Sequence, residues 1–177
     1  MKGTARTVAA VAASLLIFCG GTSHAKQGQR DAEHADITQI NLCNIHFFEN
    51  AEHKGGEFTK YAGNGNSHGY DTGFQYAGAL TPAELSPFST KIGPMKQGDL
   101  APGGTIEVHF IHTTAQVQPG QNLGSGLSKA TGSPQLRSKT QVIALVNDKG
   151  TIDFEHLAKV MVISGMYQAP NIPANAR

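Results

Sequence analysis

The clearest pattern along the chain is an alternation of apolar and polar side chains over residues 104–114, GTIEVHFIHTT. Ile106, Val108 and Phe110 alternate with Glu107 and His109. A period of two residues is that of a strand with one buried face. The pattern therefore predicts a β-strand, which the turn APGG introduces.

Two more segments, residues 37–48 and 138–148, have the β-branched and aromatic content of strands. In the first, period two places Leu42, Asn44, His46 and Phe48 on one face, opposite Cys43, Ile45 and Phe47. The Gly-rich segments 49–73 and 119–135 predict long loops. Residues 80–89 predict one helical turn, and residues 153–161 fit either helix or strand. The predicted fold class is mainly β, an antiparallel sheet domain with long Gly-rich loops and little helix.

The first 25 residues have the form of a secretory signal peptide. Lys2 and Arg6 precede the apolar run VAAVAASLLIF, and Ser23-His24-Ala25 forms a small-x-small cleavage site. The run is shorter than the roughly 20 apolar residues of a membrane span. We expect removal of residues 1–25, a loose arm over residues 26–36, and one domain over residues 37–177. That domain would be periplasmic or secreted, with no membrane attachment after cleavage.

Charge and cysteine content narrow the class of partner. Cleavage after Ala25 removes two of the 14 basic residues and none of the 13 acidic ones, which leaves a net charge of −1. With no basic cluster, nothing favours nucleic-acid binding. Only Cys43 remains, and a lone cysteine cannot form an internal disulfide, although export implies an oxidising compartment.

The histidines raise the question of a metal site. His109 shares a strand face with Glu107, and a carboxylate beside an imidazole is a common partner of a metal ligand. His46 lies among apolar residues, so a buried ring there needs partners for its nitrogens. In both cases a hydrogen-bonded structural or solvent-exposed histidine is the alternative. Glu52-His53 follows the first strand and fits either a metal-site pair or a solvated loop.

The other four histidines of the mature chain favour structural or solvent roles. His112 falls on the face opposite His109, whereas His34, His68 and His156 lie in polar segments. The chain contains no Gly-x-Ser-x-Gly elbow, no phosphate-binding loop and no Cys-x-x-Cys pair. A metal site is therefore the chemistry that the sequence supports.

Three ordered blocks resemble the delta-class carbonic anhydrases and, more faintly, the alpha class. They are CNIHFFENAEHKGGEF, GGTIEVHFIHTT followed by PGQNLGSGL, and SPQLRSKTQVIALVND, within about residues 37–170. The resemblance implies a zinc enzyme that reversibly hydrates carbon dioxide to bicarbonate. In the family three imidazoles hold the zinc, which lowers the pKa of bound water to about 7 and supplies the attacking hydroxide. By this resemblance, His46 and His109 are zinc ligands, Glu107 orients His109, and Glu52 orients the zinc hydroxide through a hydroxyl.

The chain departs from the family pattern at three places. Family members commonly have His-x-His in the first strand, but the second position here is Phe48, whose phenyl ring cannot bind zinc. His53 is the nearest substitute for the third ligand, with His68 or His112 as alternatives. Related sequences carry a cysteine where Gly126 stands, which would account for a partnerless Cys43. The family also continues past YQAP with further strands, so a C-terminally truncated member is an alternative.

These observations predict an exported zinc-dependent carbonic anhydrase with carbon dioxide and bicarbonate as substrates. The first alternative is a catalytically impaired or non-catalytic metal-binding protein of the same fold, which Phe48 and the short C-terminus favour. The second is a secreted β domain that binds a partner. The sequence indicates no oligomeric state.

Overall fold

The computed structural model describes residues 6–8, 37–65, 71–89, 92–95, 98–129, 131–148 and 150–172. The described elements are mostly strands, with one short α-helix and two 3-10 turns. In chain order they are β1 (Arg6–Val8), η1 (Ile37–Gln39), β2 (Asn41–Glu49), β3 (Phe58–Asn64), β4 (Thr72–Tyr76), β5 (Ile92–Met95), β6 (Gly98–Leu100), β7 (Thr105–Thr113), η2 (Leu123–Gly126), β8 (Leu136–Val146), β9 (Ile152–Asp153), α1 (Phe154–Leu157), β10 (Met161–Ile163) and β11 (Met166–Gln168).

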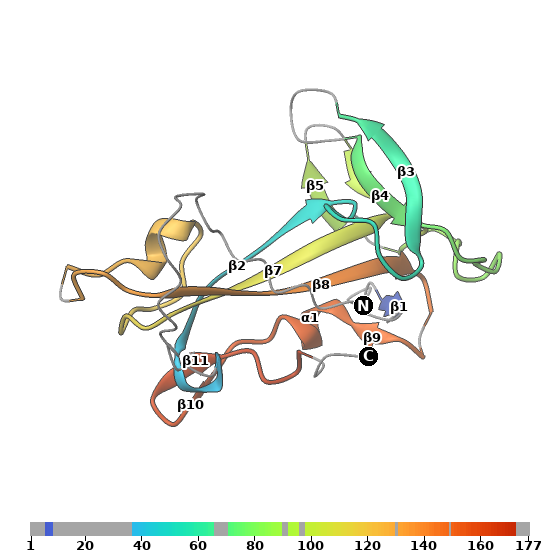
Figure 1. The fold of residues 1–177 in the computed structure, drawn as a ribbon. Coiled ribbons are helices and arrows are strands. Elements are labelled where there is room, and N and C mark those ends of the chain that lie inside the picture. Colours follow the sequence, from blue (N-terminus) through green and yellow to red (C-terminus); the bar gives the residue numbers. More distant parts are fainter. Residues whose placement is uncertain are drawn as a thin grey trace.

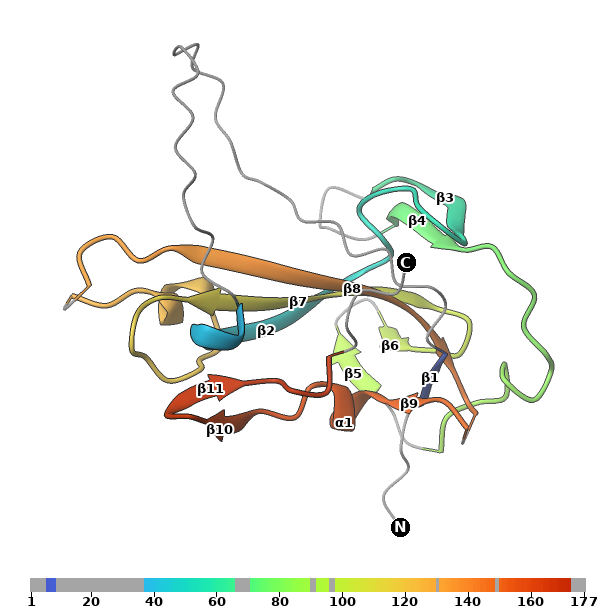
Figure 2. The same ribbon diagram turned by 60° about the horizontal axis from the view of Figure 1, so that its bottom comes forward.

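The framework is a five-stranded sheet in the order β2-β7-β8-β1-β9, in which neighbouring strands are antiparallel. Its three long strands, β2, β7 and β8, run side by side across the molecule (Figures 1 and 2). Three two-stranded hairpins, β3–β4, β5–β6 and β10–β11, accompany the sheet. The prediction of a mainly β, antiparallel fold with little helix is confirmed.

The two faces of the long strands pack against two different apolar clusters. One face carries the main apolar core, where Ile106, Val108 and Phe110 of β7 are at most 2% exposed. This core also contains Leu42, Ile143, Leu145, Leu157 and Ala169. On the other face a smaller cluster of Phe58, Ala51 and Ala144 lies against residues of the β3–β4 hairpin. This hairpin covers only one end of that face (Figure 1), so side chains near the middle of β2 and β7 retain solvent access.

A β-bulge at Cys43 changes the predicted faces of β2. Leu42 pairs with His112 and Asn44 pairs with Ile111, so Cys43 is an extra residue between two successive pairs. An inserted residue shifts the alternation by one position. Leu42 therefore lies in the main core, against the prediction that it shares a face with Asn44 and His46. The alternation is correct from Asn44 onward.

The segment 49–73, predicted as a loop, contains strand residues, and further strands lie outside the three predicted ones. Residues 58–64 and 72–76 form the β3–β4 hairpin, although the Gly and Asn content of this part of the chain is typical of a loop. The register of the hairpin shifts at two places, and Gly63 and Gly73 adopt positive φ. The C-terminal segment contains β11, paired with β10. Residues 153–161 resolve into the single turn α1 followed by β10.

The predicted helical turn near Thr81 is a hydrogen-bonded turn rather than a helix. The Leu85 N–H donates to the Thr81 carbonyl at 3.1 Å. The Glu84 carboxylate accepts from the Thr81 N–H at 2.6 Å, and the Glu84 N–H donates to the Thr81 hydroxyl at 3.3 Å. This reciprocal pair is the arrangement of a helix N-terminal capping box.

The predicted signal peptide and N-terminal arm lie almost entirely outside the described residues. Within them the structure describes only β1, which pairs with Ala144–Val146 of β8 and with β9. Among the described helices, none is long and apolar enough to cross a membrane. Cleavage near Ala25 and export stay predictions.

Candidate metal centre

His46 and His109 are directly opposite each other in the β2–β7 ladder. Directly opposed side chains in an antiparallel pair have Cβ atoms about 5 Å apart and project from the same face. Accordingly, the two imidazole centroids are 5.1 Å apart, with 45° between the ring planes. The ladder therefore brings together two of the three residues predicted to bind metal.

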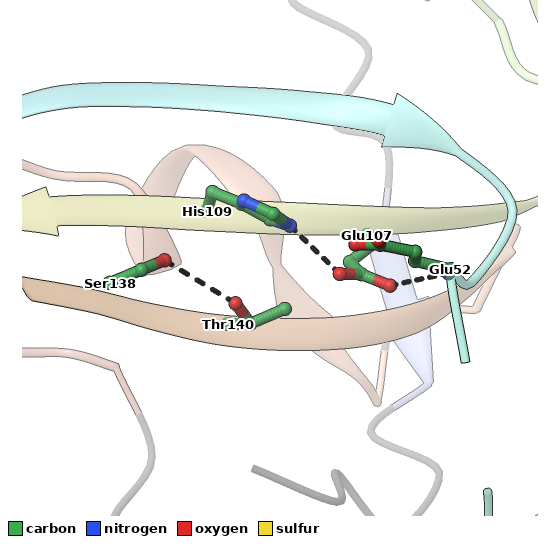
Figure 3. Close-up of polar contacts among 5 residues, drawn as sticks. All are labelled: Glu52, Glu107, His109, Ser138 and Thr140. Atoms are coloured by element: carbon green, nitrogen blue, oxygen red, sulfur yellow. Dashed lines mark hydrogen bonds and ion pairs between the residues drawn. The ribbon is translucent and has the colours of Figure 1, made fainter. Parts of the chain in front are cut away.

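Glu107 is hydrogen-bonded to the ring of His109. The His109 Nε2–H donates to Glu107 Oε1 at 2.8 Å, and the Glu52 main-chain N–H donates to Glu107 Oε2 at 2.7 Å (Figure 3). Burial alone would raise the pKa of Glu107, but the bonds from His109 and from the Glu52 N–H outweigh it and lower the pKa below its ordinary value. Because Nε2 carries the proton in this bond, Nδ1 of a neutral His109 keeps its lone pair.

Asn44 accepts a hydrogen bond from the ring of His46, as Glu107 does from the ring of His109. Asn44 Nδ2 donates to the Gly120 carbonyl at 2.8 Å, which leaves Asn44 Oδ1 as an acceptor. Oδ1 lies 2.5 Å from His46 Nδ1, so this nitrogen carries the proton and Nε2 keeps its lone pair. Burial, followed by the nearby His109, lowers the pKa of His46 and favours the neutral form that metals require.

Phe48 completes a triangle of rings with the two histidines. Its centroid lies 5.3 Å from that of His46 and 5.2 Å from that of His109, close to the separation of the two imidazoles. The ring is 53% exposed, so it is not held there by burial in the core. The position that would give a third imidazole is thus occupied by a ring without a lone pair.

The third predicted ligand, His53, is not part of this group. Among the described residues, no set of three His, Cys, Asp or Glu side chains is placed to hold a metal ion. After β2 the chain turns at Asn50, and an isolated β-bridge joins Ala51 to Phe74. Glu52 and His53 follow in an exposed segment. The described residues therefore bring two imidazoles together and do not fit a site of three imidazoles.

Glu52 contacts the site through its main chain. Its N–H binds Glu107, whereas its side chain is exposed. Two hydroxyl side chains, Ser138 and Thr140, lie on the neighbouring strand β8, where Thr140 pairs with His109 (Figure 3). Their oxygens are 3.5 Å apart. The predicted action of Glu52 through a hydroxyl stays a prediction.

The other described histidines lie away from the ring triangle. His112 is 1% exposed on the core face, where its Nδ1–H donates to the Phe110 carbonyl at 3.1 Å, in agreement with the predicted face. His156 is exposed on α1. His34 and His68 fall outside the described residues.

Sequence reasoning missed Asn44, although a signal for it was present. Glu107 was recognised because it precedes His109 by two residues and therefore shares its strand face. Asn44 precedes His46 by the same interval. An amide at that position supplies the same acceptor, so the pattern acceptor-x-His on two adjacent strands identifies both pairs.

A family model for delta carbonic anhydrase matches residues 37–177. The match covers the ring triangle, the residues that orient the imidazoles and most of the described strands. Searches of curated proteins and of solved structures gave no significant match. Because the family model covers well over half of the chain, the chain belongs to the delta carbonic anhydrase family.

Proposed function

We propose that the chain is an exported, zinc-binding carbonic anhydrase of impaired activity, in which His46 Nε2 and His109 Nδ1 bind the ion. Family membership supports a carbonic-anhydrase-like function on a small-molecule substrate, carbon dioxide or bicarbonate. The ring triangle is the observation that supports zinc binding and impaired activity, and the signal-peptide pattern of residues 1–25 supports export. Two imidazoles with oriented lone pairs remain, and Phe48 stands where a third would complete the set.

A site with two imidazoles instead of three differs in its zinc affinity and in the coordination geometry of the ion. Catalytic zinc sites use three protein ligands and keep the fourth position for water or substrate. With two imidazoles, the ion is held more weakly and its remaining positions are less defined. Hydration of carbon dioxide by this chain should therefore be slow compared with that of a site with three imidazoles.

Zinc titration and a hydration assay test the proposal on the same protein. A competing chelating dye measures the zinc affinity, and stopped-flow detection of acid release measures carbon dioxide hydration. His46→Ala and His109→Ala should each abolish stoichiometric zinc binding and any residual hydration. His156→Ala is the matched control, because this exposed histidine lies on α1. A chain that takes up no zinc, or a loss equal in all three variants, would overturn the proposal.

His53 remains the candidate for a third ligand in the zinc-loaded protein. It is close enough to Glu107 for its charge to lower the pKa of that carboxyl. If His53 binds the ion, His53→Ala should weaken zinc binding as strongly as His46→Ala. An unchanged affinity would leave a two-imidazole site.

Export has its own test. Expression of the full chain, followed by cell fractionation and N-terminal sequencing, should give a periplasmic or secreted product that begins near Lys26. An intact N-terminus in the cytoplasmic fraction would contradict it.

A further inference from the structure

A cavity of about 320 Å³ opens beside the end of β2. Figure 1 shows how the chain passes from this end of β2 toward the β3–β4 hairpin. This volume is at the lower end of the range for small-molecule sites, so the cavity suits one compact molecule. Its described lining comes from the end of β2, the turn after it and the start of β4: Phe48, Glu49, Asn50, Ala51, Glu52, Thr72 and Gly73. It shares Phe48 with the ring triangle but contains neither histidine in its described lining.

The side chain of Asn50 lacks partners beside this cavity. Asn50 is 2% exposed, and neither its side-chain nitrogen nor its side-chain oxygen has a hydrogen-bond partner among the described residues. Leaving a buried amide unpaired costs about 1–3 kcal/mol for each group. Native proteins rarely carry such groups unless a ligand, ion or water completes them.

The backbone holds Asn50 at this place. Its N–H donates to the Thr105 carbonyl at 2.7 Å, and the next residue, Ala51, exchanges two hydrogen bonds of 2.8 Å with Phe74. Asn50 adopts φ 64°, a conformation that a non-glycine residue enters at a cost. The backbone of Asn50 is thus fixed beside the cavity, while its buried side-chain amide is left without a partner that a ligand could supply.

The charge of the cavity selects the ligand. Among its described lining residues, the charged ones are Glu49 and Glu52, both acidic. Burial, followed by the Asp71 carboxylate, raises the pKa of Glu49, and a bound cation would favour its charged form. The exposed ring of Phe48 offers an electron-rich face to a cation. Anions are therefore disfavoured and cations favoured.

The apolar part of the lining points to an organic cation rather than a metal. Calcium needs six to eight oxygen ligands and magnesium a near-octahedral set. Here Phe48, Ala51 and Gly73 share the wall with the two carboxylates. A planar cation can stack on the phenyl ring and donate N–H bonds at its edge, which fits both kinds of wall.

We propose that this cavity binds a small planar organic cation of the amidinium or guanidinium class. Its N–H groups donate to Glu49 and to Asn50 Oδ1, once the Asn50 side chain turns toward the cavity, and its flat face packs on Phe48. The Asn50 N–H group is left for an acceptor on the ligand or for water. The described lining includes neither His46 nor His109, so binding of the cation can be measured without zinc.

Three molecules of one shape and different charge test the proposal: benzamidinium, benzamide and benzoate. Titration calorimetry on the full chain should show benzamidinium binding at least about tenfold more tightly than benzamide, which is about 1.4 kcal/mol. Benzoate should not bind. In nitrogen–proton correlation spectra, the amide signals of Thr72 and Gly73 should move with benzamidinium, because both residues line the cavity.

Two variants and one control locate the site. Glu49→Gln keeps the shape of the side chain, removes one charge and should weaken benzamidinium binding about fivefold to tenfold. Asn50→Gly removes the amide and suits positive φ, so it should weaken binding without lowering the melting temperature. Glu155→Gln, which changes an exposed carboxylate on α1, should leave binding unchanged.

Equal affinity for the three probes, no saturable benzamidinium binding at millimolar concentration, or equal losses in Glu49→Gln and Glu155→Gln would each overturn the proposal. These outcomes are separate from the zinc titration, since a chain that binds no zinc can still bind the cation.

Discussion

The phenyl ring of Phe48 lies 5.2 Å from the imidazole of His109, centroid to centroid, with 72° between the ring planes. The same ring is 5.3 Å from His46. A histidine side chain at position 48 would therefore place a third imidazole beside the other two without a change in the backbone. The residues that orient His46 and His109 are already present.

Phe48→His should convert the two-imidazole group into a three-imidazole zinc site. Altered hydrogen-bond partners of ligands change zinc affinity by about 10–100-fold, so a gained ligand should raise it by at least about 100-fold. Carbon dioxide hydration should rise in parallel in the stopped-flow assay. Tyr61→His, at another exposed aromatic residue, is the control. No gain in affinity with Phe48→His, or an equal gain with Tyr61→His, would show that the triangle is not a metal geometry.

Asn44→Leu should weaken zinc binding by about 10–100-fold, the usual effect of removing a residue that orients a metal ligand. Nitrogen chemical shifts of the His46 ring provide a readout that a purely structural role would not move. In the unsubstituted protein these shifts should show a proton on Nδ1, and the substitution should release this preference. Asn122→Leu is the control, because the Asn122 side chain makes no capping hydrogen bond. A ring protonated on Nε2 before substitution would contradict the assigned hydrogen bond.

The strand pattern was readable from the sequence because period-two alternation reflects burial directly. Residues 104–114 became β7, and 138–148 became most of β8. The bulge at Cys43 was not readable, since no residue there has the positive φ or the glycine that marks many bulges. The β3–β4 hairpin was missed for the opposite reason, as its glycines looked like loop residues.

Some residues of the candidate site could be predicted from the sequence and others could not. His46, His109 and Glu107 could be named from spacing and family resemblance, and the ladder confirms that they meet. The main-chain role of Glu52 and the position of His53 depend on the turn at Asn50, which has no signature in composition. The unpaired Asn50 amide is likewise a property of packing between segments distant in the chain.

Gly126→Cys should form a disulfide with Cys43. A Cβ atom at Gly126 would lie 3.0 Å from Cys43 Sγ, and about 3 Å separates Cβ from the far sulfur in a disulfide with an S–S bond near 2.05 Å. The backbone at Gly126 has no positive φ, so a cysteine fits there. Leu136 Cδ2 also lies 3.0 Å from this position, but that leucine is exposed and can move.

The measurement for Gly126→Cys is a thiol titration before and after oxidation with glutathione disulfide, followed by thermal unfolding. With residues 1–25, and hence Cys19, removed, the oxidised protein should have no free thiol and about 2–4 kcal/mol more stability than its reduced form. Gly132→Cys, at a glycine with open space around it, should keep its thiols free. Two free thiols in oxidised Gly126→Cys would show that the two positions do not meet in solution.

His112 should make the protein less stable as the pH falls. Burial, offset in part by the bond to the Phe110 carbonyl and assisted by the charge of Lys139, lowers the pKa of His112 from 6.5 to about 4. Below pH 6.5 the unfolded chain gains a proton that the folded chain does not take up until about pH 4. Stability is therefore full above pH 6.5 and is lost progressively between these two values. The whole difference corresponds to about 3 kcal/mol.

Urea unfolding at intervals from pH 7 to pH 4 measures this dependence. His112→Gln keeps an N–H that can donate to the Phe110 carbonyl but cannot gain a proton, so most of the slope in this window should vanish. The control His156→Gln, at an exposed histidine, should retain the slope of the unsubstituted protein. A slope that survives unchanged in His112→Gln would assign the acid sensitivity to other groups, such as His46, whose pKa is also lowered, and would contradict this prediction.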